Sequence, residues 1–171
     1  MHGDSEDEKA PEGAGMDAMR DGRQSARAAE IARGVMRVLD LHGLRGIAEL
    51  TLASGRRADI AALDQRGDIW IVEIKSSIED FRSDQKWPEY RDYCDRLFFA
   101  VAPDFPQELI PDTCGLVVAD RYGGEIVRQA GEHRLAPARR KAVTLLLARV
   151  AAGRLMTLAD PERRYEPLPR Q

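Results

Sequence analysis

The stretch GDIWIVEIKSS, residues 67–77, decides the fold of this chain. Its central part, IWIVEIK at 69–75, is apolar enough for a buried strand and nevertheless contains Glu73 and Lys75. Side chains of a strand alternate between two faces, so both residues share one face near the carboxyl end. Charges in such a place are costly unless they are paired or metal-bound, and this pair therefore predicts a functional site. A surface salt bridge is the commoner origin of an E-x-K pattern, and that alternative stays open here.

Two further strands come before this one. They are AELTL at 48–52 and RADIAAL at 57–63. The short turn SG separates them, and a second short turn, DQRGD, leads from 57–63 into 69–75. The short second turn makes 57–63 the hairpin partner of 69–75. We therefore expect Asp59 to converge with Glu73, with Lys75 beside them, and Glu49 of the first strand could come close as well.

The rest of the chain alternates between helical and strand patterns. Helices are expected at 24–43, at 78–94 with a break at Pro88, and at 138–156. Apolar strands are expected at 96–102, 114–120 and 124–130. The resulting order, αβββαβββα, predicts an α/β fold with a mixed central sheet flanked by helices.

Composition and charge divide the chain into one domain and two tails. The 171 residues suit a single domain, which we place at 23–158. Residues 1–22 carry seven acids and two bases, a charge of −5, and are expected to be a disordered tail. The total charge is −3, so residues 23–171 carry −3 − (−5) = +2, which permits a polyanionic partner. Residues 159–171 are expected to be a loose C-terminal tail.

Cellular location is inferred from what the sequence lacks. There is no signal peptide at the N-terminus, and no apolar run reaches the roughly 18 residues of a membrane span, so no membrane association is expected. Cys94 and Cys114 lie in no metal-type or CxxC pattern and are read as reduced core residues. These features favour a cytoplasmic protein. Nothing in the sequence indicates its oligomeric state.

Two carboxylates and a lysine at a strand end suit metal-assisted chemistry. Carboxylate oxygens bind Mg²⁺, with Mn²⁺ as a second possibility, and the metal keeps waters and contacts substrate phosphate. Such a metal lowers the pKa of a bound water, and the lysine neutralises developing negative charge or orients the water. We therefore expect Asp59 and Glu73 to hold a metal ion and Lys75 to assist the reaction.

These residues also carry a family resemblance. The pattern RADI…IWIVEIKSS resembles the D-(x)n-E-x-K core of the PD-(D/E)XK nuclease superfamily, with Ala58 where the name has proline. Residues of about 25–155 are similar to the MmcB-like DNA repair proteins of alphaproteobacteria. The resemblance implies a restriction-endonuclease-like αβββαβ core and a metal-dependent nuclease-like role in DNA repair. It places Asp59, Glu73 and Lys75 on the catalytic triad, and either Glu30 or Glu49 as a further metal ligand.

The resemblance also implies partners. These are damaged or branched DNA and a second repair protein. The residues expected to contact DNA are Arg56, Arg57, Ser76, Gln85, Lys86, Trp87 and Tyr90. For several of them a structural role is an open alternative: Ser76 and Ser77 could cap a helix, Trp87 and Tyr90 could pack in the core, and Arg56 could be a solvated turn residue.

Two other functions remain open from the sequence. One is a catalytically weak DNA-binding or scaffold protein that keeps the nuclease fold. The other is a nuclease that acts on RNA, because only the family resemblance favours DNA.

Overall fold

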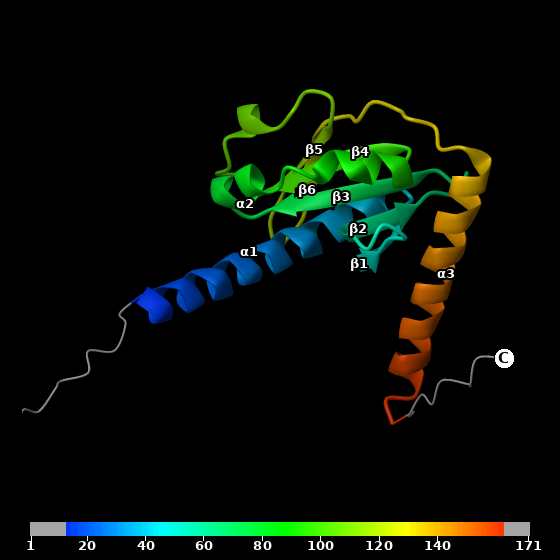
Figure 1. Cartoon of the computed structure of the whole chain (residues 1–171), viewed down its shortest axis with the longest axis horizontal. Coiled ribbons are helices and arrows are strands. Elements are labelled where there is room, and N and C mark those ends of the chain that lie inside the picture. The colour runs from blue at the N-terminus through cyan, green and yellow to red at the C-terminus, as the bar shows by residue number, and fades with distance from the viewer. Residues whose placement is uncertain (1–12, 163–171) are drawn as a thin grey trace, which may run out of the picture.

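A computed structural model describes residues 13–162 of the chain, with side chains from residue 26 onward (Figure 1). The elements follow the expected order. They are helix α1 (Gly13–Leu41), strands β1 (Arg45–Thr51), β2 (Arg57–Leu63) and β3 (Ile69–Lys75), helix α2 (Ile78–Ser83), the 3₁₀ helix η1 (Trp87–Tyr93), strand β4 (Arg96–Val101), the 3₁₀ turn η2 (Gln107–Leu109), strands β5 (Gly115–Ala119) and β6 (Gly124–Arg128), and helix α3 (Pro137–Ala159).

The strands form one six-stranded sheet in the order β1-β2-β3-β4-β5-β6. The first three are antiparallel neighbours, which confirms the expected hairpin between β2 and β3. Strands β3, β4 and β5 run parallel, and β6 returns antiparallel to β5. A parallel pair needs a crossover connection, and α2 with η1 supplies it between β3 and β4. The mixed sheet flanked by helices is the predicted fold class, consistent with a restriction-endonuclease-like core.

A hydrophobic core lies on each face of the sheet. On one face α1 packs Ile31, Val35 and Val38 against alternate residues of β2, β3 and β4. On the other face η1 contributes Tyr90 and Tyr93, and α3 contributes Val143 and Leu147. Figure 1 shows α1 below the sheet and α2 beside the carboxyl end of β3. Because β3 and β4 are covered on both sides, almost every residue in them is buried.

The segment after β3 is interrupted as its proline predicts. Helix α2 ends at Ser83, and a separate 3₁₀ helix begins at Trp87 with Pro88 in its first turn. Proline fits there because the first turn of a helix leaves its N–H groups without internal partners. Ser77 is the N-cap of α2 and accepts a hydrogen bond from the Asp80 N–H (3.1 Å). The capping role expected for this serine is confirmed.

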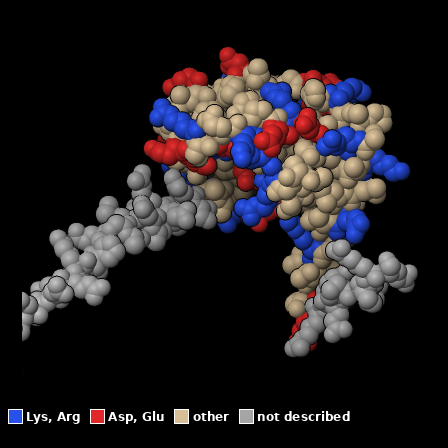
Figure 2. All heavy atoms as spheres, viewed as in Figure 1, with Lys and Arg blue, Asp and Glu red and all other residues tan. Residues whose placement is uncertain are grey.

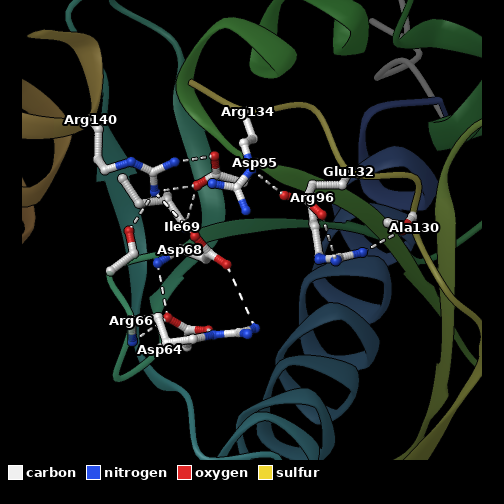
Figure 3. Close-up of polar contacts among 11 residues, drawn as sticks. Asp64, Arg66, Asp68, Ile69, Asp95, Arg96, Ala130, Glu132, Arg134 and Arg140 are labelled. Carbon is white, nitrogen blue, oxygen red and sulfur yellow. Dashed lines mark hydrogen bonds and ion pairs between the residues drawn. The ribbon is translucent and has the colours of Figure 1, made fainter. Parts of the chain in front are cut away.

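A buried polar cluster joins the amino ends of β3 and β4 to the start of α3 (Figure 3). Asp95 is 1% exposed and accepts hydrogen bonds from the N–H groups of Ile69 (2.8 Å) and Leu135 (3.0 Å). Arg140 binds both oxygens of the same carboxylate, at 2.7 and 2.6 Å. Four donors on one carboxylate lock three separate segments together.

Helix α3 extends beyond the body of the protein (Figure 1). Its first half packs on the sheet, whereas every residue from 151 to 159 is exposed. By length and composition this helix could cross a membrane, so the expectation that no stretch was long and apolar enough is wrong. Arg149 and Arg154 interrupt its apolar sequence, yet the average over 18 residues stays apolar. One such helix is weak evidence for a membrane span.

One expected domain boundary falls inside a helix. Helix α1 begins at Gly13, so the helix runs through the expected boundary at residue 23. Residues 1–12 of the expected acidic tail and residues 163–171 of the expected C-terminal tail lie outside the described residues.

Both cysteines are free and buried. Cys94 ends η1 and Cys114 precedes β5. Burial raises the pKa of Cys94 to about 12 and also raises the pKa of Cys114. They are core residues, as the sequence indicated.

Candidate active site

The candidate site lies where the ladder between β2 and β3 opens. Backbone pairing ends at Ile60 and Val72, one position before Asp59 and Glu73 would face each other. Side chains take over at that point. The Asp59 N–H donates to Glu73 Oε1 (3.2 Å), and the Ile74 N–H donates to Asp59 Oδ2 (2.7 Å). The two carboxylates therefore lie side by side, as the hairpin register predicted.

Both carboxylates are poorly compensated in charge. Glu73 is 3% exposed, and burial raises its pKa to about 8, with repulsion from Asp59 adding to the rise. The pKa of Asp59 is also raised, mainly by burial. Hydrogen bonds from backbone N–H groups and the positive charge of Lys75 oppose these shifts without cancelling them. The pair is short of positive charge, which a bound cation would supply.

Lys75 is buried beside the pair and is held by a residue that the sequence did not single out. Its Nζ donates to Asp84 Oδ2 at 2.6 Å and lies 5.9 Å from the centre of the Phe99 ring. The second oxygen of Asp84 accepts the N–H of Lys86 (3.1 Å). Asp84 ends α2, so the helix that follows β3 places the partner of the lysine.

These side chains line one cavity of about 690 Å³, called the site cavity below. Its walls come from α1, β1, β2, β3, α2 and η1, and its residues are Ala28, Ala29, Ala32, Ala48, Glu49, Arg56, Arg57, Asp59, Glu73, Ile74, Lys75, Asp80 and Tyr90. Helix α1 contributes only alanines, which leaves room next to the two carboxylates.

The two further carboxylates that the resemblance implied lie in different places. Glu49 lines the site cavity, but its side chain is 64% exposed and pairs with Arg57 at 3.7 Å. Glu30 is exposed on α1 and does not line the cavity, because the alanines occupy the inward face. Of the two, only Glu49 is near the site.

The arginines beside Asp59 border the cavity. Arg56 is hydrogen-bonded to Glu89 (2.8 Å) and lies over the Tyr90 ring, whereas Arg57 is largely exposed. Arg57 is thus the more available cation for a phosphate group.

The remaining residues expected at DNA have mostly structural surroundings. Ser76 is buried and donates to Asp80 (3.3 Å). Trp87 packs edge-on against Phe99, and Tyr90 is buried with its hydroxyl donating to the Arg57 carbonyl (2.9 Å). For both aromatic residues, core packing is the alternative that the structure shows. Gln85 and Lys86 are exposed, and the Gln85 side chain bonds to the Arg82 carbonyl (2.7 Å).

Sequence reasoning missed two acidic residues at the site, Asp80 and Asp84. Asp80 lines the cavity and accepts from the Ser76 N–H (3.0 Å). Its spacing from Ser77 is that of a capping box, a signal that was present in the sequence. The role of Asp84 had no such signal, because it depends on where α2 ends.

The donor set fits a magnesium-type ion of low protein coordination. Among residues 13–162 no group of three or more His, Cys, Asp or Glu side chains is placed to hold a metal. Mg²⁺ needs only one or two protein carboxylates, because it keeps several waters and binds substrate phosphates. Asp59 and Glu73 provide that number, and their raised pKa values mark a place where a cation would be stabilised.

Charge on the surface is mixed rather than uniform. Figure 2 shows Lys and Arg interspersed with Asp and Glu over the face that it presents, with no continuous basic area on that face among the described residues. On this face, binding to nucleic acid would therefore depend on local groups more than on a broad positive field.

Two solved structures are similar to this chain. One is described as the SPO1766 protein of unknown function from Silicibacter pomeroyi. It is 47% identical, covers 81% of this chain and 95% of that chain, and has a TM-score of 0.79. The other is Pyrococcus furiosus SfsA in complex with Ca²⁺, at 14% identity over 65% of this chain and 64% of that chain. Its TM-score of 0.32 is too low to support an inference.

A search among curated proteins finds no match. A family model described as DNA repair protein MmcB-like matches residues 15–162, which is nearly the whole of the described chain. The chain therefore belongs to the MmcB-like DNA repair protein family.

Proposed function

We propose that this protein is a metal-dependent nuclease of the PD-(D/E)XK type that hydrolyses phosphodiester bonds in DNA. The observation that carries the proposal is the pair of carboxylates, buried Glu73 and half-buried Asp59, at the open end of the β2–β3 ladder. A buried lysine lies next to them and all three line the site cavity. Membership of a DNA repair family supports DNA as the substrate.

Asp59 and Glu73 would hold Mg²⁺ or Mn²⁺. When bound, such an ion supplies an activated water and stabilises negative charge on the phosphate. Each carboxylate has one oxygen engaged by a backbone N–H, which fixes its orientation and leaves the other oxygen for the ion.

Lys75 would stabilise the negative charge that develops on the phosphate. Its ammonium is desolvated by Phe99 and the neighbouring strands, where a positive charge acts more strongly than in water. Asp84 holds the ammonium in place. Arg57, exposed at the rim of the cavity, would contact a flanking phosphate.

One observation favours a second candidate function, a catalytically weak protein that binds DNA or a repair partner. The Lys75 ammonium is already paired with Asp84 at 2.6 Å, so a phosphate would have to compete with that carboxylate. A scaffold protein would tolerate this competition, whereas an enzyme must overcome it.

The test is cleavage of labelled single-stranded, duplex and branched DNA, and of matched RNA, with Mg²⁺ or Mn²⁺. Wild type is compared with Glu73→Gln and Lys75→Ala. Glu125→Gln serves as the control, because Glu125 is an exposed glutamate on β6 outside the cavity. We expect metal-dependent DNA cleavage that falls at least about 100-fold in both site variants and persists in the control.

Other outcomes favour the other functions. Cleavage of RNA alone would replace the proposed substrate. If wild type binds DNA but cuts no substrate with either metal, and the variants bind equally well, the scaffold function is correct.

A further inference from the structure

Strand β1 contains a strained residue directly opposite the site. Glu49 has φ of +53°, and no other residue besides glycine has a positive φ in the described part of the chain. In this left-handed conformation a side chain's Cβ comes too close to the following carbonyl oxygen, so only glycine adopts it without penalty.

The strain interrupts the sheet at Asp59. In the β1–β2 register, Ala48 pairs with Ile60 and Leu50 pairs with Ala58, yet Glu49 and Asp59 between them are not paired. On its other side Asp59 has also left the ladder, since its N–H donates to the Glu73 side chain. The backbone at Asp59 is thus released from both neighbouring strands, and its carboxylate reaches the Ile74 N–H.

An arginine from a distant part of the chain holds the strained turn of β1. Arg154 of α3 donates to the Ala48 carbonyl through Nη1 (2.5 Å) and to the Glu49 carbonyl through Nη2 (3.0 Å). The two carbonyls belong to the residues on either side of the peptide bond that leads into the positive φ. One guanidinium therefore bridges the distortion, and a planar fork suits this task better than an ammonium.

We propose that Arg154 is a positioning residue of the active site: it keeps Glu49 in its left-handed conformation and so keeps Asp59 free to hold the metal ion. The inference rests on the proposed nuclease function for its catalytic consequence. It gives α3, which lies outside the αβββαβ core, a part in the chemistry of that core.

The same arginine could instead act only by attracting DNA. Arg149 separates the two roles, because it is an exposed arginine five residues earlier on α3 with no contact to β1 among the described interactions. A loss of electrostatic attraction would appear in both variants as weaker DNA binding. A positioning role affects Arg154 alone and lowers kcat more than it changes KM.

The decisive experiment places glycine at position 49, so that the positive φ no longer needs Arg154 to hold it. We would combine Arg154→Ala with Glu49→Gly and, as a matched control, with Glu49→Ala. Both changes at 49 remove the same carboxylate, but only glycine adopts a positive φ without strain. We expect Arg154→Ala to lower kcat about ten-fold in the wild-type and Glu49→Ala backgrounds, a factor comparable to the left-handed penalty. In the Glu49→Gly background its effect should fall below about two-fold.

A second readout does not depend on cleavage. Hydrogen exchange at the Asp59 amide reports whether its bond to Glu73 is kept, and the shift in melting temperature with Mn²⁺ reports metal binding. We expect Arg154→Ala to speed that exchange and reduce the Mn²⁺ shift, and Glu49→Gly to prevent both effects. If these changes occur in a protein that cuts no substrate, the positioning role stands and only the nuclease function fails. The inference is overturned if Arg154→Ala leaves both readouts unchanged, or if glycine and alanine at position 49 respond alike.

Discussion

Strand β3 has a buried carboxylate cluster near each of its ends, and the two clusters are treated in opposite ways. At the amino end, Asp95 receives two backbone N–H groups and both arms of Arg140. At the carboxyl end, Asp59 and Glu73 share a few N–H donors and repel each other. Glu73 and Asp95 are both almost fully buried, so the difference between these two carboxylates lies in the number of positive partners.

The pKa values express that difference. Burial alone would raise the pKa of Asp95, but the hydrogen bonds from Arg140, Ile69 and Leu135 outweigh it and lower the pKa below the ordinary value of 3.8. The pKa of Glu73 is raised to about 8. The first cluster stabilises the fold, whereas the second is kept at a cost in stability. A chain retains such a cost where the site has another task.

The largest effect is expected from Asp95→Ala. It removes the acceptor that Arg140 shares with two backbone N–H groups and leaves Arg140 only its contacts with Gly67 and Asp68, so it should lower the free energy of unfolding by roughly 3–5 kcal/mol. Urea denaturation would measure the change. Asp112→Ala is the control, because that exposed aspartate pairs with Arg128 at the surface (2.9 Å) and should contribute about 1 kcal/mol or less. Equal losses of unfolding free energy in Asp95→Ala and Asp112→Ala would contradict a structural role for Asp95.

The contribution of Asp95 should also depend on pH in a defined direction. Its pKa in the folded protein is lowered, so its stabilisation is fully present above the unfolded value of 3.8 and is lost as the pH falls through the lower folded value. The difference in stability between wild type and Asp95→Asn should therefore be constant near neutral pH and shrink below about pH 4.

At the cluster of Asp59 and Glu73, removing a carboxylate should raise the free energy of unfolding instead of lowering it. Glu73→Gln removes a buried charge that repels Asp59, so without divalent cations it should raise the free energy of unfolding by about 1–3 kcal/mol at pH 8.5. The folded pKa of about 8 lies above the unfolded value of 4.5. The gain should be absent below pH 4.5, grow between the two values and be complete above 8. Melting curves at pH 4 and 8.5 in EDTA would measure it, and a destabilised variant at pH 8.5 would contradict it.

Metal addition should reduce the cost in stability of the Asp59 and Glu73 cluster and so make the two clusters more alike. A cation bound by Asp59 and Glu73 stabilises the folded state by about 1.4 kcal/mol at ten times its dissociation constant. We expect Mg²⁺ to raise the melting temperature of wild type and not of Glu73→Gln. Asp95→Asn, made at the other end of β3, should keep the full metal response, so a loss of the response there would contradict two independent clusters.

The smallest effect is expected from Tyr90→Phe. It removes the hydroxyl, which donates to the Arg57 carbonyl and interacts with Arg56, while the ring stays in the core, so the loss should be about 1 kcal/mol. Tyr122→Phe at an exposed turn is the matched control and should change stability by less than about 0.5 kcal/mol. Denaturant midpoints would compare the two, and a loss of several kcal/mol in Tyr90→Phe would mean that the hydroxyl supports the site cavity more widely.

What the sequence predicted follows from short-range rules. The alternation in 69–75 and the short turn before it were enough to bring Asp59 to Glu73, because hairpin register is set locally. Pro88 marked the break between α2 and η1 for a similar reason. The partners of the charged groups were not predictable in this way. The pairing of Lys75 with Asp84, of Asp95 with Arg140 and of Arg154 with β1 depends on how distant elements pack.

The two buried cysteines allow local opening of the structure to be measured without adding a label site. A thiol reacts as its thiolate, and the raised pKa values and burial of Cys94 and Cys114 keep both inert in the closed protein. Their rate of alkylation therefore measures how often the surrounding structure opens. Both lie beside the parallel strands β4 and β5, so labelling follows that half of the sheet and leaves the β1–β2 hairpin unseen. An unmodified chain can thus show how often the half of the sheet that holds β4 and β5 opens.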